Sequence, residues 1–325
     1  MIRRLSIKNF KSVRQLWIEC RRVNIFIGEP NTGKSNILEA LGLISMMAFR
    51  DHPELFIRVR EPHQLFYNYN VREEIRVSLD EHKVVGRFTR EGYASFYDEG
   101  RGFLMAIRPD GKQFSRAPPI SSSIRFYRFK SDVKFRKSDE TFLLPPCGSN
   151  LPSVLMLNPS LRQMVYDILE DYGQRLAVDP HEPSLSVAWE LEGVLQLLPY
   201  ELASDTLRRF IFHLAAVESN KGAIITMEEP EAHAFPTYTK LLAERIALDK
   251  SNQYFITTHN PYFLLSLAEK TPARDLAIYI TYLHGRETRA KLLSEDELAD
   301  LMDLASAVFF NLDRFLKDVL EAPGP

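Results

Sequence analysis

Residues 22–47 read RVNIFIGEPNTGKSNILEALGLISMM, and this stretch decides what kind of fold the chain adopts. The apolar run VNIFI at 23–27 indicates a buried strand. After it, apolar side chains recur at the spacing of one helical face, at Ile37, Leu38, Leu41, Ile44 and Met47. Between strand and helix, residues 28–35 fit the pattern G-x-x-x-x-G-K-[ST]. The sequence therefore predicts a strand, a phosphate-binding loop and a helix in direct succession.

The spacing within this loop suits the phosphates of a nucleotide. Glycines let the backbone wind tightly, so that successive N–H groups point at phosphate oxygens. Lys34 can reach the β- and γ-phosphates, and the Ser35 hydroxyl can bind Mg²⁺ at the positive end of the helix. A chance match arises in on the order of one chain in a hundred, and the flanking strand and helix weaken that explanation. The predicted nucleotide-binding residues are Gly28, Glu29, Pro30, Asn31, Thr32, Gly33, Lys34, Ser35 and Asn36.

Two carboxylates and a histidine follow apolar runs further along the chain. Glu228 and Glu229 end the run GAIITM, and His259 follows QYFITT. Ligands of parallel sheets bind beyond the carboxyl ends of the strands, so we expect all three side chains near the phosphates. One glutamate can hold a Mg²⁺-bound water, the next can orient or deprotonate the attacking water, and the histidine can donate to the γ-phosphate. The alternatives are a solvated acidic turn and a structural histidine.

The remaining patterns indicate an α/β protein with a different middle. Residues 73–130 carry short period-two runs separated by turns, which is typical of an antiparallel meander. In the mixed stretch that follows, Ser160 is a plausible helix N-cap and Gly173 a plausible stop. Ser294 and Glu297 form a capping-box pattern before the last helix. We predict an α/β P-loop NTPase with an antiparallel β region and a helical insertion.

The order of these motifs resembles the ABC-type ATPases of the SMC, Rad50 and RecF kind. More narrowly, the chain resembles the small AAA_21 and AAA_15 ATPases related to the ATPase half of OLD nucleases. The similar segments are IRRLSIKNFKSV, GEPNTGKSNILEAL (their Walker A), GSNLPSVL, MEEPEAHAFP (their Walker B) and FITTHNPYFL. The resemblance implies one ATPase head in three parts: 1–130 with the Walker A loop and an antiparallel lobe, 131–200 as a mixed helical insertion, and 201–325 with the remaining motifs.

The resemblance also implies roles for individual residues. Gly28–Ser35 would bind ATP and Mg²⁺, Glu228 would hold the metal as the Walker B acid, and Glu229 and His259 would act with Lys34 in catalysis. Lys11 matches a basic position near the nucleotide. Two heads of this kind sandwich two ATP molecules, which implies an ATP-dependent homodimer.

Two departures from the family pattern bear on these roles. The Walker B acid is usually aspartate, so the longer arm of Glu228 is expected to alter the metal contact and slow turnover. The signature motif is degenerate: LASDTLRRF at 202–210 has Ser204 displaced and Asp205 near the usual glycine. A carboxylate facing a γ-phosphate would repel it, and a plain helix cap is the alternative interpretation. No motif in the sequence matches the Q-loop glutamine, and Gln64 is a candidate outside the predicted site residues.

Composition limits the partners. The formal net charge of −2 gives no global attraction to nucleic acid, and the two cysteines fit no disulfide or zinc pattern. No signal peptide and no run of 18 apolar residues is present, so we expect a cytoplasmic protein without a membrane partner. One segment, 124–137, interleaves basic residues with aromatics and could bind DNA, or could be a strand with a basic outer face. Its basic residues are Arg125, Arg128, Lys130, Lys134, Arg136 and Lys137.

Three functions remain open from the sequence, and the third is a nucleic-acid-binding module in repair or in defence against mobile elements. The leading hypothesis is a Mg²⁺-dependent ATPase that acts in DNA repair, DNA maintenance or defence, beside a separate effector protein. The alternative is an ATP-sensing switch with negligible turnover that regulates a partner. The altered Walker B acid and the degenerate signature motivate this alternative.

Overall fold

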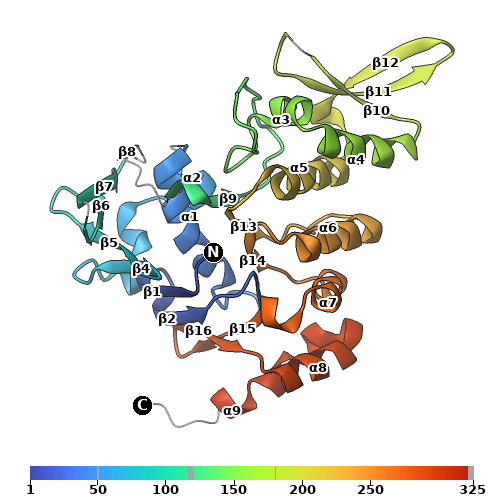
Figure 1. Ribbon diagram of the computed structural model, residues 1–325. Helices are drawn as coiled ribbons and strands as arrows, with labels where there is room; N and C mark the ends of the chain where they lie inside the picture. The colour runs from blue at the N-terminus through green and yellow to red at the C-terminus, as the bar shows by residue number, and fades with distance from the viewer. Residues whose placement is uncertain (50, 101, 111, 116–120, 180, 321–325) are drawn as a thin grey trace.

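The computed structural model describes residues 1–49, 51–100, 102–110, 112–115, 121–179 and 181–320. The last five residues of the predicted part 201–325 thus lie outside the described residues. Within the described part of the chain, the strands form three sheets, and a long helix lies between the two larger ones (Figure 1). The fold is the expected α/β P-loop architecture with an antiparallel lobe, and the insertion contains a three-stranded sheet beside its helices.

A six-stranded sheet carries the predicted motifs. Its order is β16-β15-β3-β14-β13-β9, and all its neighbours pair in parallel except β15 and β16. Every residue of β3 is buried, as expected for a strand covered on both faces. The strands are β3 (Val23–Gly28), β9 (Ile124–Tyr127), β13 (Ile224–Glu228), β14 (Gln253–Thr257), β15 (Leu276–His284) and β16 (Glu287–Leu292).

The second sheet is antiparallel and has the order β2-β1-β4-β5-β6-β7-β8. It confirms the predicted meander up to residue 115, but β9 does not belong to it. The prediction of an antiparallel β9 is wrong because a strand of only four residues fits either sheet, and only tertiary pairing with β13 decides. The strands are β1 (Arg4–Phe10), β2 (Val13–Glu19), β4 (Ile75–Leu79), β5 (His82–Phe88), β6 (Ala94–Asp98), β7 (Gly102–Ile107) and β8 (Gln113–Ser115).

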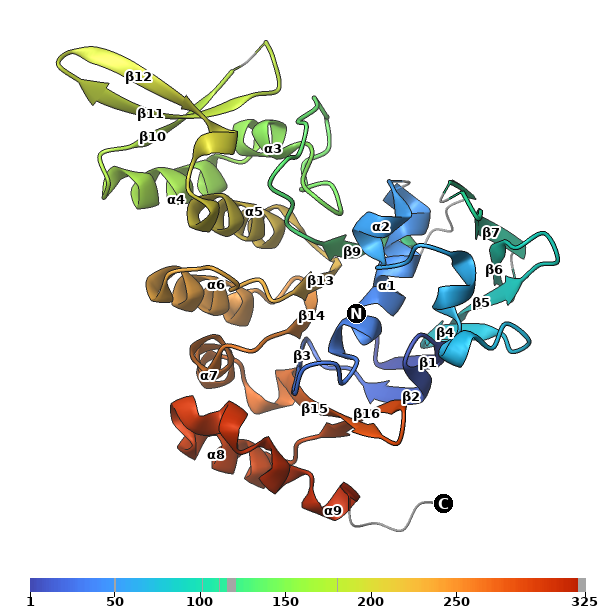
Figure 2. The ribbon, with the colours of Figure 1, turned by 180° about the vertical axis from the view of Figure 1, so that it is seen from behind.

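Helix α1 (Lys34–Phe49) follows the phosphate loop and lies between these two sheets (Figures 1 and 2). Twelve of its 16 residues are buried. The predicted single apolar face is therefore too narrow: Leu43 and Met46 are as buried as Leu41 because the helix is enclosed all round. Two polar side chains, Glu39 and Ser45, are also fully buried in it. Both need partners from neighbouring elements.

Helices cover the other face of the parallel sheet, where α5, α6 and α7 lie one after another (Figures 1 and 2). The α-helices after α1 are α2 (Pro53–Phe56), α3 (Leu151–Leu157), α4 (Pro159–Glu170), α5 (Asp205–Ser219), α6 (Pro236–Leu248), α7 (Pro261–Lys270), α8 (Glu295–Asp303) and α9 (Lys317–Leu320). The 3₁₀ helices are η1 (Pro62–Leu65), η2 (Tyr67–Tyr69), η3 (Ser121–Ser123), η4 (Tyr200–Leu202), η5 (Ala273–Asp275), η6 (Ala305–Phe310) and η7 (Leu312–Phe315).

The helix ends test the capping predictions. The capping box of Ser294 and Glu297 at the start of α8 is confirmed. Ser160 is not the N-cap of α4, because Asn158 caps that helix and Pro159 takes its first position. The helix ends at Glu170, before Gly173 with its φ of 64°.

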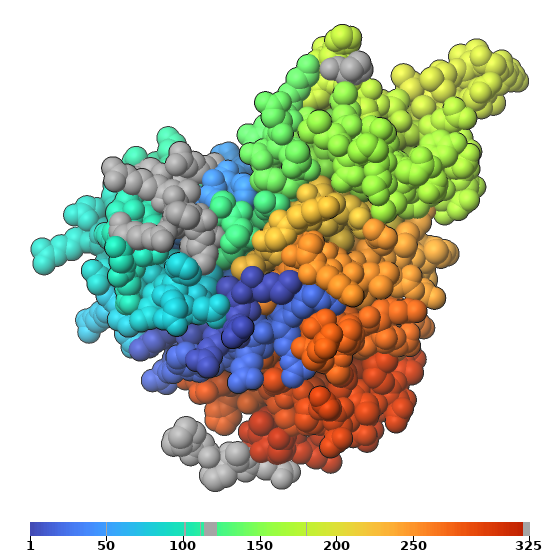
Figure 3. Space-filling view, in the orientation of Figure 1, coloured from blue at the N-terminus to red at the C-terminus, as the bar shows by residue number. Residues whose placement is uncertain are grey.

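A third, three-stranded sheet projects from the body as an arm (Figures 1 and 3). Its strands are β10 (Arg175–Val178), β11 (Leu185–Leu191) and β12 (Val194–Pro199). The two-residue loop Glu192–Gly193 has φ values of 53° and 79°. This fits the tight hairpin turns that match strand twist.

Candidate active site

The phosphate loop connects β3 to α1 and is supported by the hairpin of β15 and β16. Gly28 and Gly33 have φ values of 146° and 95°, which side chains rarely adopt. A Cβ at Gly33 would lie 2.0 Å from Thr288 Oγ1, so only glycine fits there. Thr32 Oγ1 donates to the carbonyl of Glu29 at 2.8 Å, which tightens the loop. The glycines of the motif therefore serve both the loop conformation and its close packing.

Lys34 opens helix α1 and folds back over the loop. Its ammonium group donates to the carbonyls of Gly28 at 2.8 Å and Glu29 at 2.7 Å. Burial lowers the pKa of Lys34 to about 8, although Glu229 and Glu228 oppose this shift. The group thus lies among backbone acceptors, where phosphate oxygens would offer it stronger, charged ones.

The two acids lie where the parallel sheet predicts them. Glu228 ends β13, and the Ser35 hydroxyl donates a hydrogen bond to its Oε1 atom. Arg58 Nη2 lies 3.1 Å from Oε1 of this glutamate, and Arg128 Nη2 lies 3.2 Å from Oε2. The carboxylate of Glu228 is therefore shared between the loop and two guanidinium groups.

Glu229 and His259 form the second pair at this edge of the sheet. The neighbouring strands β13 and β14 bring them together, and Glu229 Oε1 lies 3.1 Å from His259 Nε2. The hydrogen bond from His259 is the main cause that lowers the pKa of Glu229, against its partial burial. The backbone of Glu229 has a φ of 45°, and its N–H donates to the carbonyl of Thr257 at 3.0 Å. The geometry holds the carboxylate ionised beside the loop.

An open pocket of about 470 Å³ joins these groups, a size typical of ligand sites. It is lined by Lys11, Ser12, Pro30, Asn31, Gly33, Lys34, Ser35, Asn36, Arg58, Glu229 and His259. Six of the nine predicted loop residues line it; Gly28, Glu29 and Thr32 do not. The side-chain amide of Asn36 donates a hydrogen bond to Ser12 Oγ at 2.6 Å, and Ser12 also lines the pocket. The loop, Glu229 and His259 thus face one cavity.

Several residues at this site were not predicted from the sequence. Arg58 enters from the loop after α2 and Arg128 from the end of β9, and both contact Glu228 and the buried Glu39. No local pattern marks these arginines. Glu39 did carry a signal, because it lies four residues after Ser35 and so on the same helical face.

The basic segment 124–137 does not form one surface. Arg125 donates a hydrogen bond to Asn220. Its guanidinium carbon Cζ also lies 3.5 Å from the centroid of the Phe142 ring. Arg128 points into the site already described. These two are not available to DNA. The remaining four residues are exposed: Lys130, Lys134, Arg136 and Lys137.

The signature-like segment is a helix cap in this chain. Ser204 accepts from the N–H of Leu207 at 3.2 Å, as the N-cap of α5. Asp205 is paired with Arg209 at 2.6 Å and with Arg208 at 3.4 Å. The hydrogen bond from Arg209 lowers the pKa of Asp205. The negative charge that would repel a phosphate is therefore partly neutralised, and neither residue lines the pocket of its own chain.

Gln64 is not at the site. Its side-chain oxygen accepts from the N–H groups of Arg60 at 2.9 Å and Glu61 at 3.1 Å, within a local turn. The side chain beside Glu228 at the end of the sheet is that of Arg128, not that of Gln64.

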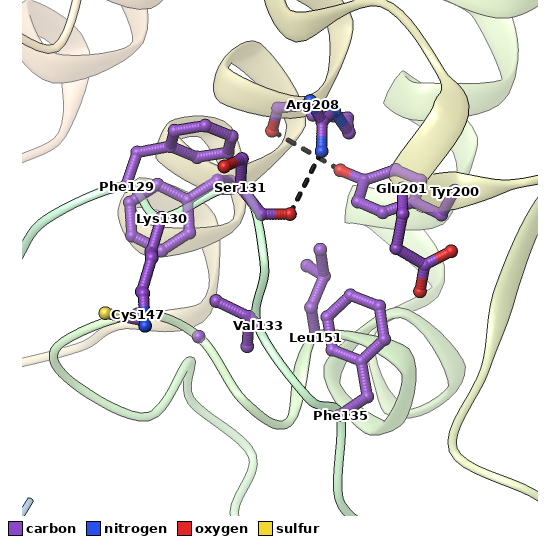
Figure 4. A pocket seen from close by; sticks show the side chains of 12 residues that line it. Phe129, Lys130, Ser131, Val133, Phe135, Cys147, Leu151, Tyr200, Glu201 and Arg208 are labelled. Carbon is purple, nitrogen blue, oxygen red and sulfur yellow. Dashed lines mark hydrogen bonds between the residues drawn. The ribbon is translucent and has the colours of Figure 1, made fainter.

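A smaller hollow lies along the segment that follows Arg128 (Figure 4). Arg208 Nη1 donates to the carbonyl of Ser131 at 3.0 Å, and the Tyr200 hydroxyl donates to the carbonyl of Arg208 at 3.3 Å (Figure 4). Half of the residues that line this hollow are aromatic or aliphatic, and none of them belongs to the predicted site. Its contacts fasten the segment after β9 to helix α5.

Two protein-family models match this chain, one over the phosphate loop and the other over Glu228, Glu229 and His259. The AAA ATPase domain family matches residues 1–142. The family described as "AAA domain, putative AbiEii toxin, Type IV TA system" matches residues 106–266. Together the two models cover residues 1–266. The chain is an ATPase. A search of curated proteins found no match to this ATPase.

Solved structures show the same fold. This ATPase is similar to an SMC head bound to the C-terminal winged-helix domain of ScpA, with a TM-score of 0.58 and 14% identity over 91% of this chain and 99% of that one. It is also similar to an SMC head with an extended coiled coil, bound to the C-terminal domain of ScpA derived from Pyrococcus furiosus. That match has a TM-score of 0.56 and 11% identity over 93% and 98% of the two chains. Among the described residues of the ATPase, no helix is long and apolar enough to span a membrane.

Proposed function

We propose that this ATPase hydrolyses Mg²⁺-bound ATP in the pocket between the phosphate loop and the ends of β13 and β14. Lys34 and the loop N–H groups would hold the phosphates, and Ser35 and Glu228 would hold the metal. Both metal-binding groups offer oxygen atoms, the type of ligand that Mg²⁺ prefers, and they are hydrogen-bonded to each other. One ion between them could therefore contact both. When bound, Mg²⁺ would neutralise charge on the β- and γ-phosphates.

Glu229 is the proposed general base, and the observation that carries this role is its contact with His259. The carboxylate lines the pocket, and its low pKa keeps it ionised. It can accept a proton from the attacking water, while the histidine orients it and can donate to the γ-phosphate.

The decisive test removes the base and keeps its shape. We expect Glu229→Gln to lower kcat by at least about a hundredfold while MgATP binding is retained. Lys34→Ala should lose nucleotide binding, measured by calorimetry. A Glu229→Gln protein that hydrolyses ATP like the parent would refute the catalytic role.

We further propose that ATP joins two copies of the chain. The pocket is open, and the N-terminus of α5 does not line the pocket of its own chain, so this helix end is free to approach a partner's nucleotide. The likeness to SMC heads supports the same idea. Light scattering of Glu229→Gln with MgATP should give twice the mass of one chain, and Ser204→Arg should prevent this. A monomer in both cases would refute dimerisation.

A role in DNA repair, DNA maintenance or defence is the proposed setting. Its structural support is the exposed group Lys130, Lys134, Arg136 and Lys137. Neutralising these four residues should weaken salt-sensitive DNA binding. Unchanged binding would exclude this surface.

The ATP-sensing switch is the second candidate function. The observation that favours it is the hold of Arg58 and Arg128 on Glu228, which a metal would have to displace. A switch would dimerise with ATP, or bind an effector protein, without releasing phosphate. Measuring size and phosphate release in one sample separates the two functions.

A further inference from the structure

The fully buried carboxylate of Glu39 joins three cations from three separate segments. Lys11, in the turn between β1 and β2, forms an ion pair with Oε2. Arg58 donates to Oε1 from both its backbone N–H, at 3.1 Å, and its Nε, at 2.8 Å. Arg128 Nη2 lies 3.3 Å from the same oxygen. The Glu39 side chain is 0% exposed, so these cations replace all its hydration.

Burying such a cluster of charged groups carries a large desolvation penalty, so it is an unfavourable way to stabilise a core. Well-packed apolar residues commonly do as well as a buried ion pair, or better. Burial alone would raise the pKa of Glu39, and the charges of Lys11 and Arg58 outweigh it and leave the pKa lowered. The carboxylate is therefore ionised, and its main effect is to fix where the cations lie.

Two of these cations face the nucleotide pocket. Lys11 and Arg58 line it together with the phosphate loop. The Arg58 side chain is 56% exposed, and its guanidinium connects Glu39 on one side with Glu228 on the other. Since Glu228 also bonds Ser35, the guanidinium lies beside the oxygens proposed to hold Mg²⁺. A Mg²⁺ ion held there would neutralise charge on the β- and γ-phosphates, so Arg58 would lie near the end of the tail that distinguishes ATP from ADP.

We propose that Glu39 is a positioning residue that holds Lys11 and Arg58 beside the triphosphate, so that Arg58 can exchange Glu228 for a phosphate oxygen when MgATP arrives. This inference rests on the proposed function of the pocket. The charges agree with it: among the described residues, Lys11, Arg58 and Arg128 form ion pairs with two carboxylates, Glu39 and Glu228, which leaves one excess positive charge in this cluster toward an anionic ligand. Glu39 keeps its own bond to Arg58 Nε throughout the exchange, so the guanidinium stays in place.

The test is a double-mutant cycle with MgATP and MgADP as the probes. Arg58→Gln should weaken MgATP binding about tenfold, the effect of one charge-assisted hydrogen bond, and MgADP binding much less. Glu39→Gln should likewise weaken the binding of MgATP more than the binding of MgADP. In the Glu39→Gln background, Arg58→Gln should have little further effect, because the arginine is no longer positioned.

Two variants separate positioning from a merely structural role. Glu39→Asp keeps the charge and should recover part of the MgATP affinity. Glu74→Gln removes another glutamate bonded to two arginines, Arg76 and Arg87, on the antiparallel lobe, and should leave the ATP-to-ADP affinity ratio unchanged. If Glu39→Gln does not fold, the comparison of Arg58→Gln with the Glu39→Asp/Arg58→Gln double variant carries the test.

The inference is overturned if Arg58→Gln binds MgATP like the parent, or if its effect is equally large with and without Glu39. It is also overturned if Glu39→Gln lowers thermal stability but leaves the ATP-to-ADP ratio unchanged. Failure of the proposed function would look different, since Lys34→Ala would then bind nucleotide normally. Loss of binding in Lys34→Ala, with no effect at Arg58 or Glu39, refutes only the inference.

Discussion

Helix α1 and strand β12 are both rich in aliphatic residues, yet they lie in opposite environments. Leu41 of α1 is 0% exposed, whereas Leu195 and Leu197 of β12 are 61% and 57% exposed. The helix is enclosed between two large sheets, while β12 is the edge of a three-stranded sheet that projects from the body (Figure 3). The phosphate loop is thus built on a helix that is mostly buried, whereas strand β12 contributes little to the core.

The largest expected contrast is a matched pair of leucine truncations. Leu41→Ala should lower the free energy of unfolding by about 3 kcal/mol, because it leaves a cavity beside the site. Leu195→Ala should change it by less than about 0.5 kcal/mol, because the side chain already lies in solvent. Urea unfolding of both variants checks this. Equal losses would mean that the arm is packed against something in solution.

The second contrast uses two glycines with positive φ. Gly33→Ala and Gly193→Ala both carry the left-handed cost of about 1 kcal/mol. Only at Gly33 does the new Cβ also meet Thr288, at 2.0 Å, while nothing lies within 4 Å at Gly193. We therefore expect Gly33→Ala to lose roughly 2 kcal/mol or more and its nucleotide binding. Gly193→Ala should bind nucleotide normally, and calorimetry with thermal melting decides between the two.

The smallest contrast concerns pH. Glu231 is buried two residues after Glu229 in the chain. Thr258 donates a hydrogen bond to its Oε1 atom, and its Oε2 atom has no partner among the described residues. Burial raises the pKa of Glu231 from 4.5 to about 7. Between these values the folded protein keeps a proton that the unfolded chain has released, so the free energy of unfolding falls as the pH rises through this window.

Wild-type protein should lose roughly 1–3 kcal/mol of stability from this group between pH 4.5 and 7.5. Glu231→Gln should remove that part of the slope, because the amide resembles the protonated acid. Glu192→Gln, at the tip of the arm, should keep the wild-type slope. Denaturant titrations across the pH range measure the difference, and parallel curves for all three proteins would refute the assignment.

Much of the fold could be predicted because its signals are local. The runs VNIFI, AIITM and QYFIT became β3, β13 and β14, and the loop residues 28–35 follow the backbone rules of a phosphate-binding turn. The position of Glu229 and His259 at one edge of the sheet was also expected, since parallel neighbours end there. Their catalytic roles stay predictions.

Other features depended on contacts that no local pattern records. The sheet that β9 joins is decided by pairing with β13, and this pairing carries Arg128 to Glu228 rather than to a DNA-facing surface. The exposure of β12 was equally hidden, because an aliphatic strand looks the same whether or not a second layer covers it.

By itself, the sequence determined the strand, glycine loop and helix that bind phosphate, because backbone conformation at Gly28 and Gly33 depends on residue type and immediate neighbours. It also determined that acids follow a buried strand. Only the tertiary structure decided which charges meet at those acids. Lys11, Arg58 and Arg128 come from three distant segments of the chain. The buried carboxylate of Glu39 pairs with all three, through contacts that form only when both sheets pack against α1.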